Sequence, residues 1–307
     1  MNDQRKGGIV WTDETWNPLR GCSRVSAGCM NCYAETMASR FCGAGQPYEG
    51  TINHETRRWS GAIKLVPEHL QDPLRWKRPR MVFVNSMSDL FHESVPDEFI
   101  DHVFAVMTLA PQHTFQVLTK RPARMLEYLS KYPCWRWLDA GKKIKPPQLG
   151  MGGIVSTVRG ALPNVWLGVS VENQEAADER IPLLLQTPAA VRWVSMEPLL
   201  GPVNLIEAMG MREPGSRFNG WAELDWVVVG GESGKNVRPM HPDWVRNLRD
   251  QCKFAGVPFM FKQWGEWRPE PKRPGETSWW AMERVGKRVA GRLLDGVQYD
   301  EYPGDTA

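Results

Sequence analysis

The sequence predicts an α/β protein in which strands and helices alternate along the chain, and three observations support this fold class. Six short apolar runs rich in Val, Phe or Trp have the composition of strands covered on both faces of a parallel sheet. Amphipathic segments with helical spacing lie between several of these runs. Polar residues follow nearly every run, as they do where parallel strands end at a ligand site. We therefore expect right-handed strand–helix–strand units.

The first element expected is a strand at residues 9–16. A cysteine-bearing loop over residues 21–33 follows it, and the segment from Tyr33 to Cys42 is expected to be helical. The six apolar runs are residues 81–86, 114–120, 165–171, 191–197, 224–232 and 257–263. Helices are expected at residues 96–111, 172–187 and 241–256, and the last of these ends at a glycine, as helices commonly do.

Two regions do not follow the strand–helix alternation. Residues 138–164 are rich in Gly, Pro and Lys, which predicts a long loop or lid inserted into the fold. After residue 267 the composition becomes rich in Pro and charged residues, which indicates a linker with a small hairpin or tail. We therefore expect a main domain over residues 1–267 and a C-terminal extension over residues 268–307.

The composition excludes several classes of protein. A net charge of +3 is too small to indicate a nucleic-acid-binding protein by itself, so any basic site must be local. The N-terminal segment lacks the apolar core of a signal peptide. No apolar run reaches the roughly 18 residues of a membrane span. We therefore expect a cytosolic protein whose thiols stay reduced.

Three of the six cysteines, Cys22, Cys29 and Cys32, lie close together with the spacing C-x6-C-x2-C. In a reducing compartment such a cluster indicates metal binding or catalysis. A closed zinc site needs four ligands, usually as two pairs, and only one C-x2-C pair is present. Three thiolates can instead hold a [4Fe–4S] cluster and leave its fourth iron open to a non-protein ligand. A zinc site completed by a distant residue and plain buried thiols are the alternatives.

Side chains able to bind a ligand follow the predicted strands. Because the carboxyl ends of parallel strands meet at one edge, we expect these residues to line one large polar site. Lys120 could alternatively form only a surface ion pair, and the sequence around Glu232 an ordinary turn. The candidates, in chain order, are Asn85, Ser86, Asp89, Lys120, Ser170, Glu172, Asn173, Glu197, Glu232 and Lys262.

A set of motifs gives the chain a family resemblance. The motifs are WNPLRGCSRVSAGCMNCYA, FVNSMSDLFH, VLTKRP, WLGVSVEN, RWVSMEPLLGP, VVVGGESG and FKQWGEW, with GRLLDG nearer the C-terminus. Together they resemble the phage Gp37/Gp68 family (DUF5131), whose members look like radical S-adenosylmethionine proteins. The resemblance covers nearly the whole chain. It implies a partial (βα)6 TIM-like barrel of the radical SAM type over residues 1–267, with a [4Fe–4S] cluster held by the three cysteines.

The same resemblance implies S-adenosylmethionine as a second cofactor, which one electron would cleave to give a 5′-deoxyadenosyl radical. It implies a contact with the methionine amino group for Asn85, Ser86 and Asp89, and with the methionine carboxylate for Lys120. It implies a contact with the ribose hydroxyls for Ser170, Glu172 and Asn173. Glu197, Glu232 and Lys262 are the implied catalytic residues.

One basic and aromatic region is a candidate for contact with nucleic acid. Arginine and tryptophan together can bind phosphates and stack on bases. The alternative is an ordinary solvated helix end. The residues concerned are Arg57, Arg58, Trp59, Arg75, Trp76 and Lys77.

The resemblance thus implies a radical S-adenosylmethionine enzyme in the cytosol of a bacterium or of a phage-infected host. Its substrate is expected in nucleic acid, and a hypermodified thymidine in phage DNA is one concrete possibility. The alternatives are a lyase that repairs a DNA lesion and a non-catalytic nucleic-acid-binding module stabilised by an iron–sulfur cluster or zinc. An electron donor such as flavodoxin or ferredoxin is the implied partner, and no membrane association is expected.

Overall fold

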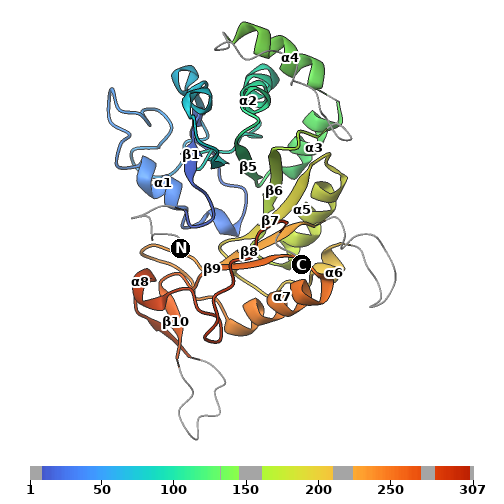
Figure 1. The fold of residues 1–307 in the computed structure, drawn as a ribbon. Helices are drawn as coiled ribbons and strands as arrows, with labels where there is room; N and C mark the ends of the chain where they lie inside the picture. The colour runs from blue at the N-terminus through green and yellow to red at the C-terminus, as the bar shows by residue number, and fades with distance from the viewer. Residues whose placement is uncertain (1–8, 132, 145–160, 210–223, 271–280, 305–307) are drawn as a thin grey trace, which may run out of the picture. The chain divides into compact units, whose positions relative to one another are not determined.

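The computed structural model describes residues 9–131, 133–144, 161–209, 224–270 and 281–304 (Figure 1). The chain is a mixed α/β protein that divides into two compact units. The first unit contains residues 1–25, 34–169 and 186–192, and the second contains residues 26–33, 170–185 and 193–307. The cysteine loop is therefore divided, because Cys22 belongs to the first unit whereas Cys29 and Cys32 belong to the second.

The first unit is built on parallel strands in the order β1-β4-β5-β6. Their bounds are Glu14–Trp16 for β1, Met81–Val84 for β4, Thr114–Thr119 for β5 and Val165–Ser170 for β6. The successive side chains Val82, Phe83 and Val84 are all buried, so both faces of β4 are covered. Burial on both faces is the expected reason for a continuous apolar run in a parallel strand.

The helices of the first unit include α2 (Asp97–Leu109), α3 (Pro122–Ser130) and the short α1 (Tyr33–Ala38). Strands β2 (Leu19–Arg20) and β3 (Lys64–Leu65) form a small antiparallel pair. Single 3₁₀ turns occupy Pro67–His69 and Asp72–Arg75 in this unit, and a third occupies Ala27–Cys29 in the second unit.

Helix α4 (Cys134–Lys143) occupies the beginning of the region expected to be a loop. Its buried residues Trp137 and Ala140 are three apart, which places them on one face of the helix. The Trp137 ring stacks on Phe104 of α2 with ring centroids 4.7 Å apart, and its indole N–H donates to the Tyr128 hydroxyl at 2.8 Å. Tertiary packing therefore overrides the Gly- and Lys-rich composition here. Residues 145–160 of the expected loop lie outside the described residues.

The second unit contains the parallel strands β7 (Val191–Met196), β8 (Trp226–Gly230) and β9 (Phe259–Gln263), in that order. Helices α5 (Gln174–Gln186), α6 (Leu205–Ala208) and α7 (Pro242–Ala255) belong to it, and α7 packs along β9 (Figure 1). Helix α7 ends at Gly256, which has a φ of +68°, a left-handed conformation that glycine adopts without strain.

The end of the chain forms an antiparallel pair and a short helix. Strand β10 (Trp267–Pro269) pairs with β11 (Met282–Arg284), and α8 (Lys287–Ala290) follows. The expected small hairpin is therefore present. Beyond α8, the chain returns to β9, where the Phe261 N–H donates to the Tyr299 carbonyl oxygen at 3.0 Å and the Phe259 N–H donates to the Glu301 carboxylate at 2.8 Å.

The six apolar runs predicted to be strands are confirmed within two residues at each end, whereas the stretch of residues 9–16 is a strand only at Glu14–Trp16. None of the helices in the described part of the chain is long and apolar enough to cross a membrane.

Candidate functional site

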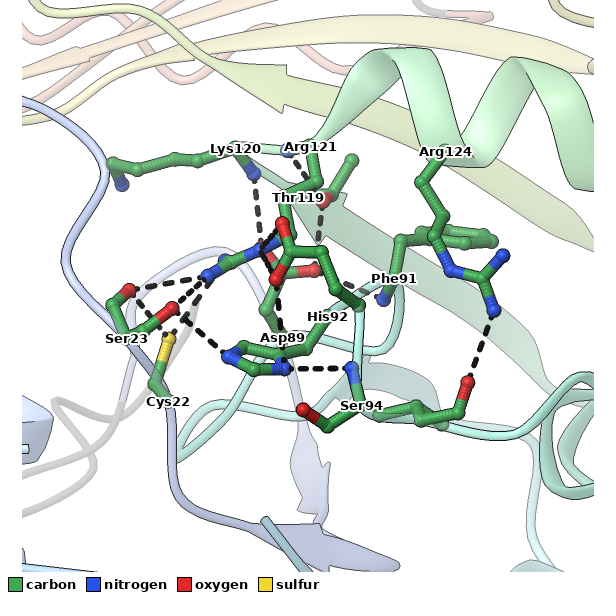
Figure 2. Close-up of polar contacts among 12 residues, drawn as sticks. Cys22, Ser23, Asp89, Phe91, His92, Ser94, Thr119, Lys120, Arg121 and Arg124 are labelled. Atoms are coloured by element: carbon green, nitrogen blue, oxygen red, sulfur yellow. Dashed lines mark hydrogen bonds and ion pairs between the residues drawn. The ribbon is translucent and has the colours of Figure 1, made fainter. Parts of the chain in front are cut away.

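In the first unit, Arg121 holds Cys22 and Ser23 against the ends of β4 and β5 (Figure 2). Arg121 is buried, and Figure 2 shows its guanidinium between Ser23 and Asp89. Its Nη2 donates to Ser23 Oγ at 2.6 Å and to the Ser23 carbonyl oxygen at 3.2 Å. Its Nη1 donates to Asp89 at 3.0 Å and lies 3.9 Å from Cys22 Sγ. Its Nε donates to both carboxylate oxygens of Glu93, at 3.0 and 3.1 Å.

Asp89 joins the end of β4 to the end of β5. Besides Arg121, its buried carboxylate accepts hydrogen bonds from Thr119 Oγ1 at 2.7 Å, from the Phe91 N–H at 3.0 Å and from the Lys120 N–H at 3.1 Å. The Lys120 side chain extends away from this carboxylate (Figure 2). Asp89 therefore has four protein donors, and it holds Arg121 in place.

His92 positions Ser23 and does not activate it. The Ser94 N–H donates to His92 Nδ1 at 3.1 Å, so the ring proton resides on Nε2, which donates to Ser23 Oγ at 2.9 Å. In a nucleophilic serine the hydrogen bond runs in the opposite direction, because the serine hydroxyl donates its proton to the histidine. Burial, and then repulsion from Arg121, lower the pKa of His92, which keeps the ring neutral.

The charges of this network reinforce each other. Although burial opposes the charged form, Asp89, Cys22 and Glu93 hold the pKa of Arg121 above its ordinary value. Burial by itself would raise the pKa of Glu93, but a hydrogen bond from its own backbone N–H and the charge of Arg121 lower this pKa overall. A positive charge beside a cysteine favours the thiolate, which is the form that binds metals.

Asn85 directly follows β4, and its buried side-chain amide has no hydrogen-bond partner among the described residues. Its φ is +62°, the left-handed region that asparagine tolerates better than most residues. Only 3% of the residue is exposed, yet both Nδ2 and Oδ1 lack a partner. Each unmet group costs roughly 1–3 kcal/mol, so a ligand that donates to one atom and accepts from the other would relieve this cost. The neighbouring Ser86 hydroxyl donates to Asn17 Oδ1 at 3.2 Å.

In the second unit, Glu172 holds the segment that precedes Cys29. The Gly28 N–H donates to Glu172 Oε1 at 3.3 Å, and Arg180 Nη1 donates to Glu172 Oε2 at 2.9 Å. The side chains of this ion pair are only 3% and 2% exposed. A Cβ atom at position 28 would lie 3.2 Å from the Glu172 carboxyl carbon, so this close approach favours glycine.

Glu232 holds the segment between Cys29 and Cys32. Asn31 Nδ2 donates to Glu232 Oε2 at 3.0 Å and to the Asn236 carbonyl oxygen at 2.8 Å. Arg238 forms an ion pair with Glu232 and donates to the Ala27 carbonyl oxygen at 3.1 Å. Burial by itself would raise the pKa of Glu232, but the hydrogen bonds from Arg238 and Asn31 lower this pKa overall.

Glu197 and Lys262 form a separate polar group in the second unit. Lys262 Nζ donates to Glu197 Oε2 at 2.6 Å. Gln263 Nε2 donates to Glu197 Oε1 at 3.0 Å and to Ser233 Oγ at 3.1 Å. Side-chain contacts therefore link the ends of β7, β8 and β9.

The remaining two candidates at strand ends make contacts within the fold. Asn173 Oδ1 accepts a hydrogen bond from the Ala176 N–H at 3.0 Å and thereby caps the start of α5. The Ser170 carbonyl oxygen accepts from Arg180 Nη1 at 2.8 Å.

The three loop cysteines are partly exposed, in contrast to Cys42 and Cys252, which are buried. Within the described ranges, no group of three or more His, Cys, Asp or Glu side chains has an arrangement that could hold a metal ion.

The tryptophans of the basic region contribute to packing inside the first unit. Trp59 packs against a small core cluster that contains Cys42, and Trp76 lies edge-on to the His113 ring with centroids 5.7 Å apart. The Arg57 side chain donates to the Ser39 carbonyl oxygen. The exposed basic residues of the predicted set are Arg57, Arg58, Arg75 and Lys77.

Sequence reasoning selected the carboxylates but not most of their partners. Arg121 directly follows Lys120 in VLTKRP, and its position after a predicted strand was the only sequence signal for it. The cysteine motif itself contained Ser23, Gly28 and Asn31, but no spacing rule identifies their partners. The residues added by the structure are Ser23, Gly28, Asn31, His92, Arg121, Arg180 and Arg238.

The fold and these contacts define an α/β protein whose strand ends hold the segments of a cysteine-bearing loop. The model of a family described as "protein of unknown function (DUF5131)" matches residues 6–303, so the chain belongs to this family. No curated protein and no solved structure matches the chain.

Proposed function

We propose that the protein is a radical S-adenosylmethionine enzyme in which Cys22, Cys29 and Cys32 hold a [4Fe–4S] cluster. The observation that carries the proposal is how the two cysteine segments are held. Each is bonded to charged groups of its own unit, while the thiols remain partly exposed. Plain packing would require neither feature, since cysteine by itself prefers full burial.

The donor chemistry fits an iron–sulfur cluster, because thiolates are the ligands that such clusters use. The bound cluster and S-adenosylmethionine would together supply a 5′-deoxyadenosyl radical that abstracts hydrogen from the substrate. Arg121 would favour the thiolate of Cys22 through its positive charge. Asn85, whose buried amide has no partner among the described residues, would bind the amino-acid part of S-adenosylmethionine. Lys120 would offer its ammonium group to the carboxylate of the same cofactor.

We also propose that the parallel strands belong to a partial (βα)6 barrel of the radical SAM type. The support is the parallel order of β1, β4, β5 and β6 in the first unit and of β7, β8 and β9 in the second. The proposed substrate is a modified base in DNA, and the proposed electron donor is flavodoxin or ferredoxin. The exposed Arg58 and Lys77 would contact DNA phosphates, which predicts binding that weakens steeply as salt increases.

The test is anaerobic reconstitution of the full chain with iron and sulfide, followed by reduction. We expect an electron paramagnetic resonance signal that shifts on addition of S-adenosylmethionine, together with formation of 5′-deoxyadenosine. Cys29→Ala should abolish both. Cys134→Ala is the matched control, because Cys134 is also partly exposed but lies on α4, and it should change neither. A protein that retains zinc, or a cluster indifferent to S-adenosylmethionine, would replace the proposal with a non-catalytic module.

A further inference from the structure

Gln263, at the end of β9, is held by Glu197 and Ser233 in one orientation. Its Nε2 donates to Glu197 Oε1 at 3.0 Å and to Ser233 Oγ at 3.1 Å, so both of its N–H protons are used. A carboxylate can only accept hydrogen bonds, and a reversed amide would place Oε1 against it. The orientation of the Gln263 amide therefore follows from its contacts.

Glu197 is itself fixed, so it cannot turn away from Gln263. Its other carboxylate oxygen, Oε2, accepts from Lys262 Nζ at 2.6 Å, and both side chains of this ion pair are mostly buried. A Cβ atom at Gly230 would lie 3.2 Å from the Glu197 carboxyl carbon, so the carboxylate packs closely against the backbone of β8. The polar group at the end of β9 is thus arranged before any ligand binds.

This arrangement leaves one acceptor and one donor available to a ligand. Gln263 is 4% exposed, and its Oε1 has no hydrogen-bond partner in the described part of the chain. Proteins rarely leave a buried amide oxygen without a donor. The Ser233 hydroxyl oxygen accepts from Gln263, so its proton remains to be donated. Ser233 is partly exposed and residues 234–236 are exposed, which gives a ligand access to this pair.

We propose that Gln263 and Ser233 form a subsite that binds the Watson–Crick edge of an unpaired base. Gln263 Oε1 accepts from an N–H of the base, and the Ser233 hydroxyl donates to the carbonyl oxygen beside it. The two side chains are joined by a hydrogen bond of 3.1 Å, so one flat ring with a donor next to an acceptor can reach both. Pairing in a duplex uses the same edge. The bound base must therefore be single-stranded or flipped out of the helix.

The subsite rests on the proposed function for its role as the substrate site, and it adds that the substrate base is unpaired. Neither the cluster nor S-adenosylmethionine takes part in these contacts. Base binding can therefore be measured on the full chain without either cofactor. The radical proposal is judged separately by 5′-deoxyadenosine formation, so the failure of one proposal can be told from the failure of the other.

The experiment measures the dissociation constant of thymidine by ligand-observed nuclear magnetic resonance, titrating the full chain to about 10 mM ligand. The wild type should bind thymidine, whose base offers an N–H beside a carbonyl oxygen. The N3-methylated analogue lacks this N–H and should bind about fivefold more weakly. This change of probe tests Gln263 without a substitution that could disturb folding.

Substitution of Ser233 tests the donor half of the subsite. Ser233→Ala removes the hydroxyl and should weaken thymidine binding about fivefold, whereas Ser233→Thr keeps a hydroxyl and should bind within about twofold of the wild type. Ser39→Ala is the matched control, because Ser39 is also partly exposed but lies in the first unit, where its hydroxyl donates to the Thr36 carbonyl oxygen. This control should bind thymidine like the wild type.

Three results would overturn the subsite. They are no thymidine binding by the wild type over the titrated range, equal affinity for thymidine and its N3-methylated analogue, and unchanged affinity in Ser233→Ala. Acetamide carries an amide N–H and a carbonyl oxygen without a ring, and it should bind more weakly than thymidine. Equal affinity for acetamide would reduce the site to a simple amide contact and refute the recognition of a base.

Discussion

Glu172→Gln should destabilise the second unit strongly, because Glu172 serves two donors with two different oxygens. Oε1 accepts from the Gly28 N–H and Oε2 accepts from Arg180. Glutamine has one acceptor oxygen, so its NH₂ group must face one of these donors. The pair is almost fully buried, and removal of one partner leaves the exposed Glu179, 3.7 Å away, as the remaining counter-ion of Arg180. Such changes cost about 3–5 kcal/mol, and the remaining bond from Arg180 to the Ser170 carbonyl oxygen favours the lower value.

The assay is urea unfolding followed by tryptophan fluorescence, with Glu179→Gln as the matched control. Glu179 lies 3.7 Å from Arg180 but is 64% exposed, so its loss should cost less than about 1 kcal/mol. The double variant Glu172→Gln/Arg180→Gln should be more stable than Glu172→Gln alone, because it removes the buried charge that has lost its main partner. The reasoning would be refuted if Glu172→Gln cost no more than Glu179→Gln, or if the second substitution added its own full cost.

Three further predictions concern the groups that hold the cysteine loop. Arg121→Lys replaces a planar group with five donors by a compact charge, so it should lower the free energy of unfolding by roughly 1.5–3 kcal/mol. Because Cys22 and Ser23 would then be held less tightly, alkylation of Cys22, measured by mass spectrometry, should become faster. Burial and Arg121 lower the pKa of His92 below the value of about 6.5 in the unfolded chain, so the unfolded chain binds a proton that the folded chain does not. The free energy of unfolding should therefore fall as pH drops from 7 to 5, and His92→Gln should flatten this dependence. Gly28→Ala should lower the urea midpoint by displacing the Glu172 carboxylate.

Matched controls separate these effects from general destabilisation. Arg124→Lys alters a partly buried arginine in the same unit and should leave the alkylation rate of Cys22 unchanged. Gly141→Ala lies inside α4, where the nearest atom to an added Cβ is 3.9 Å away, so it should be neutral or stabilising by about 1 kcal/mol. Equal effects of Gly28→Ala and Gly141→Ala would contradict the close approach to Glu172.

The strands were predictable from the sequence because their signal is local. The run VWLGVS, for example, is almost entirely buried in β6, and burial on both faces leaves a continuous apolar pattern. Helix α4 was not predictable in the same way, since its sequence has few helix signals and its stability depends on Trp137 stacking on Phe104. That contact joins positions 33 residues apart (137 minus 104), which spacing rules do not reach.

The candidate site shows the same division between local and long-range information. Strand ends drew attention to Asp89, Glu172 and Glu232, and all three lie in polar networks. Their main partners are the arginines Arg121, Arg180 and Arg238, of which the latter two follow their carboxylates by eight and six residues. The contacts of Glu172 with Gly28 and of Glu232 with Asn31 span 144 and 201 residues, so only the folded chain reveals them.

The return of the C-terminal segment to β9 has a consequence for the solubility of shortened chains. Strand β9 is the last in the order of the second unit, and an edge strand offers unpaired backbone groups to other molecules. Residues 299–301 occupy several of these groups, and the Trp226 indole also donates to the Glu301 carbonyl oxygen at 2.7 Å. A chain cut before Tyr299 would expose this edge and should aggregate by strand pairing between molecules, even though the cut removes none of the proposed cofactor-binding residues.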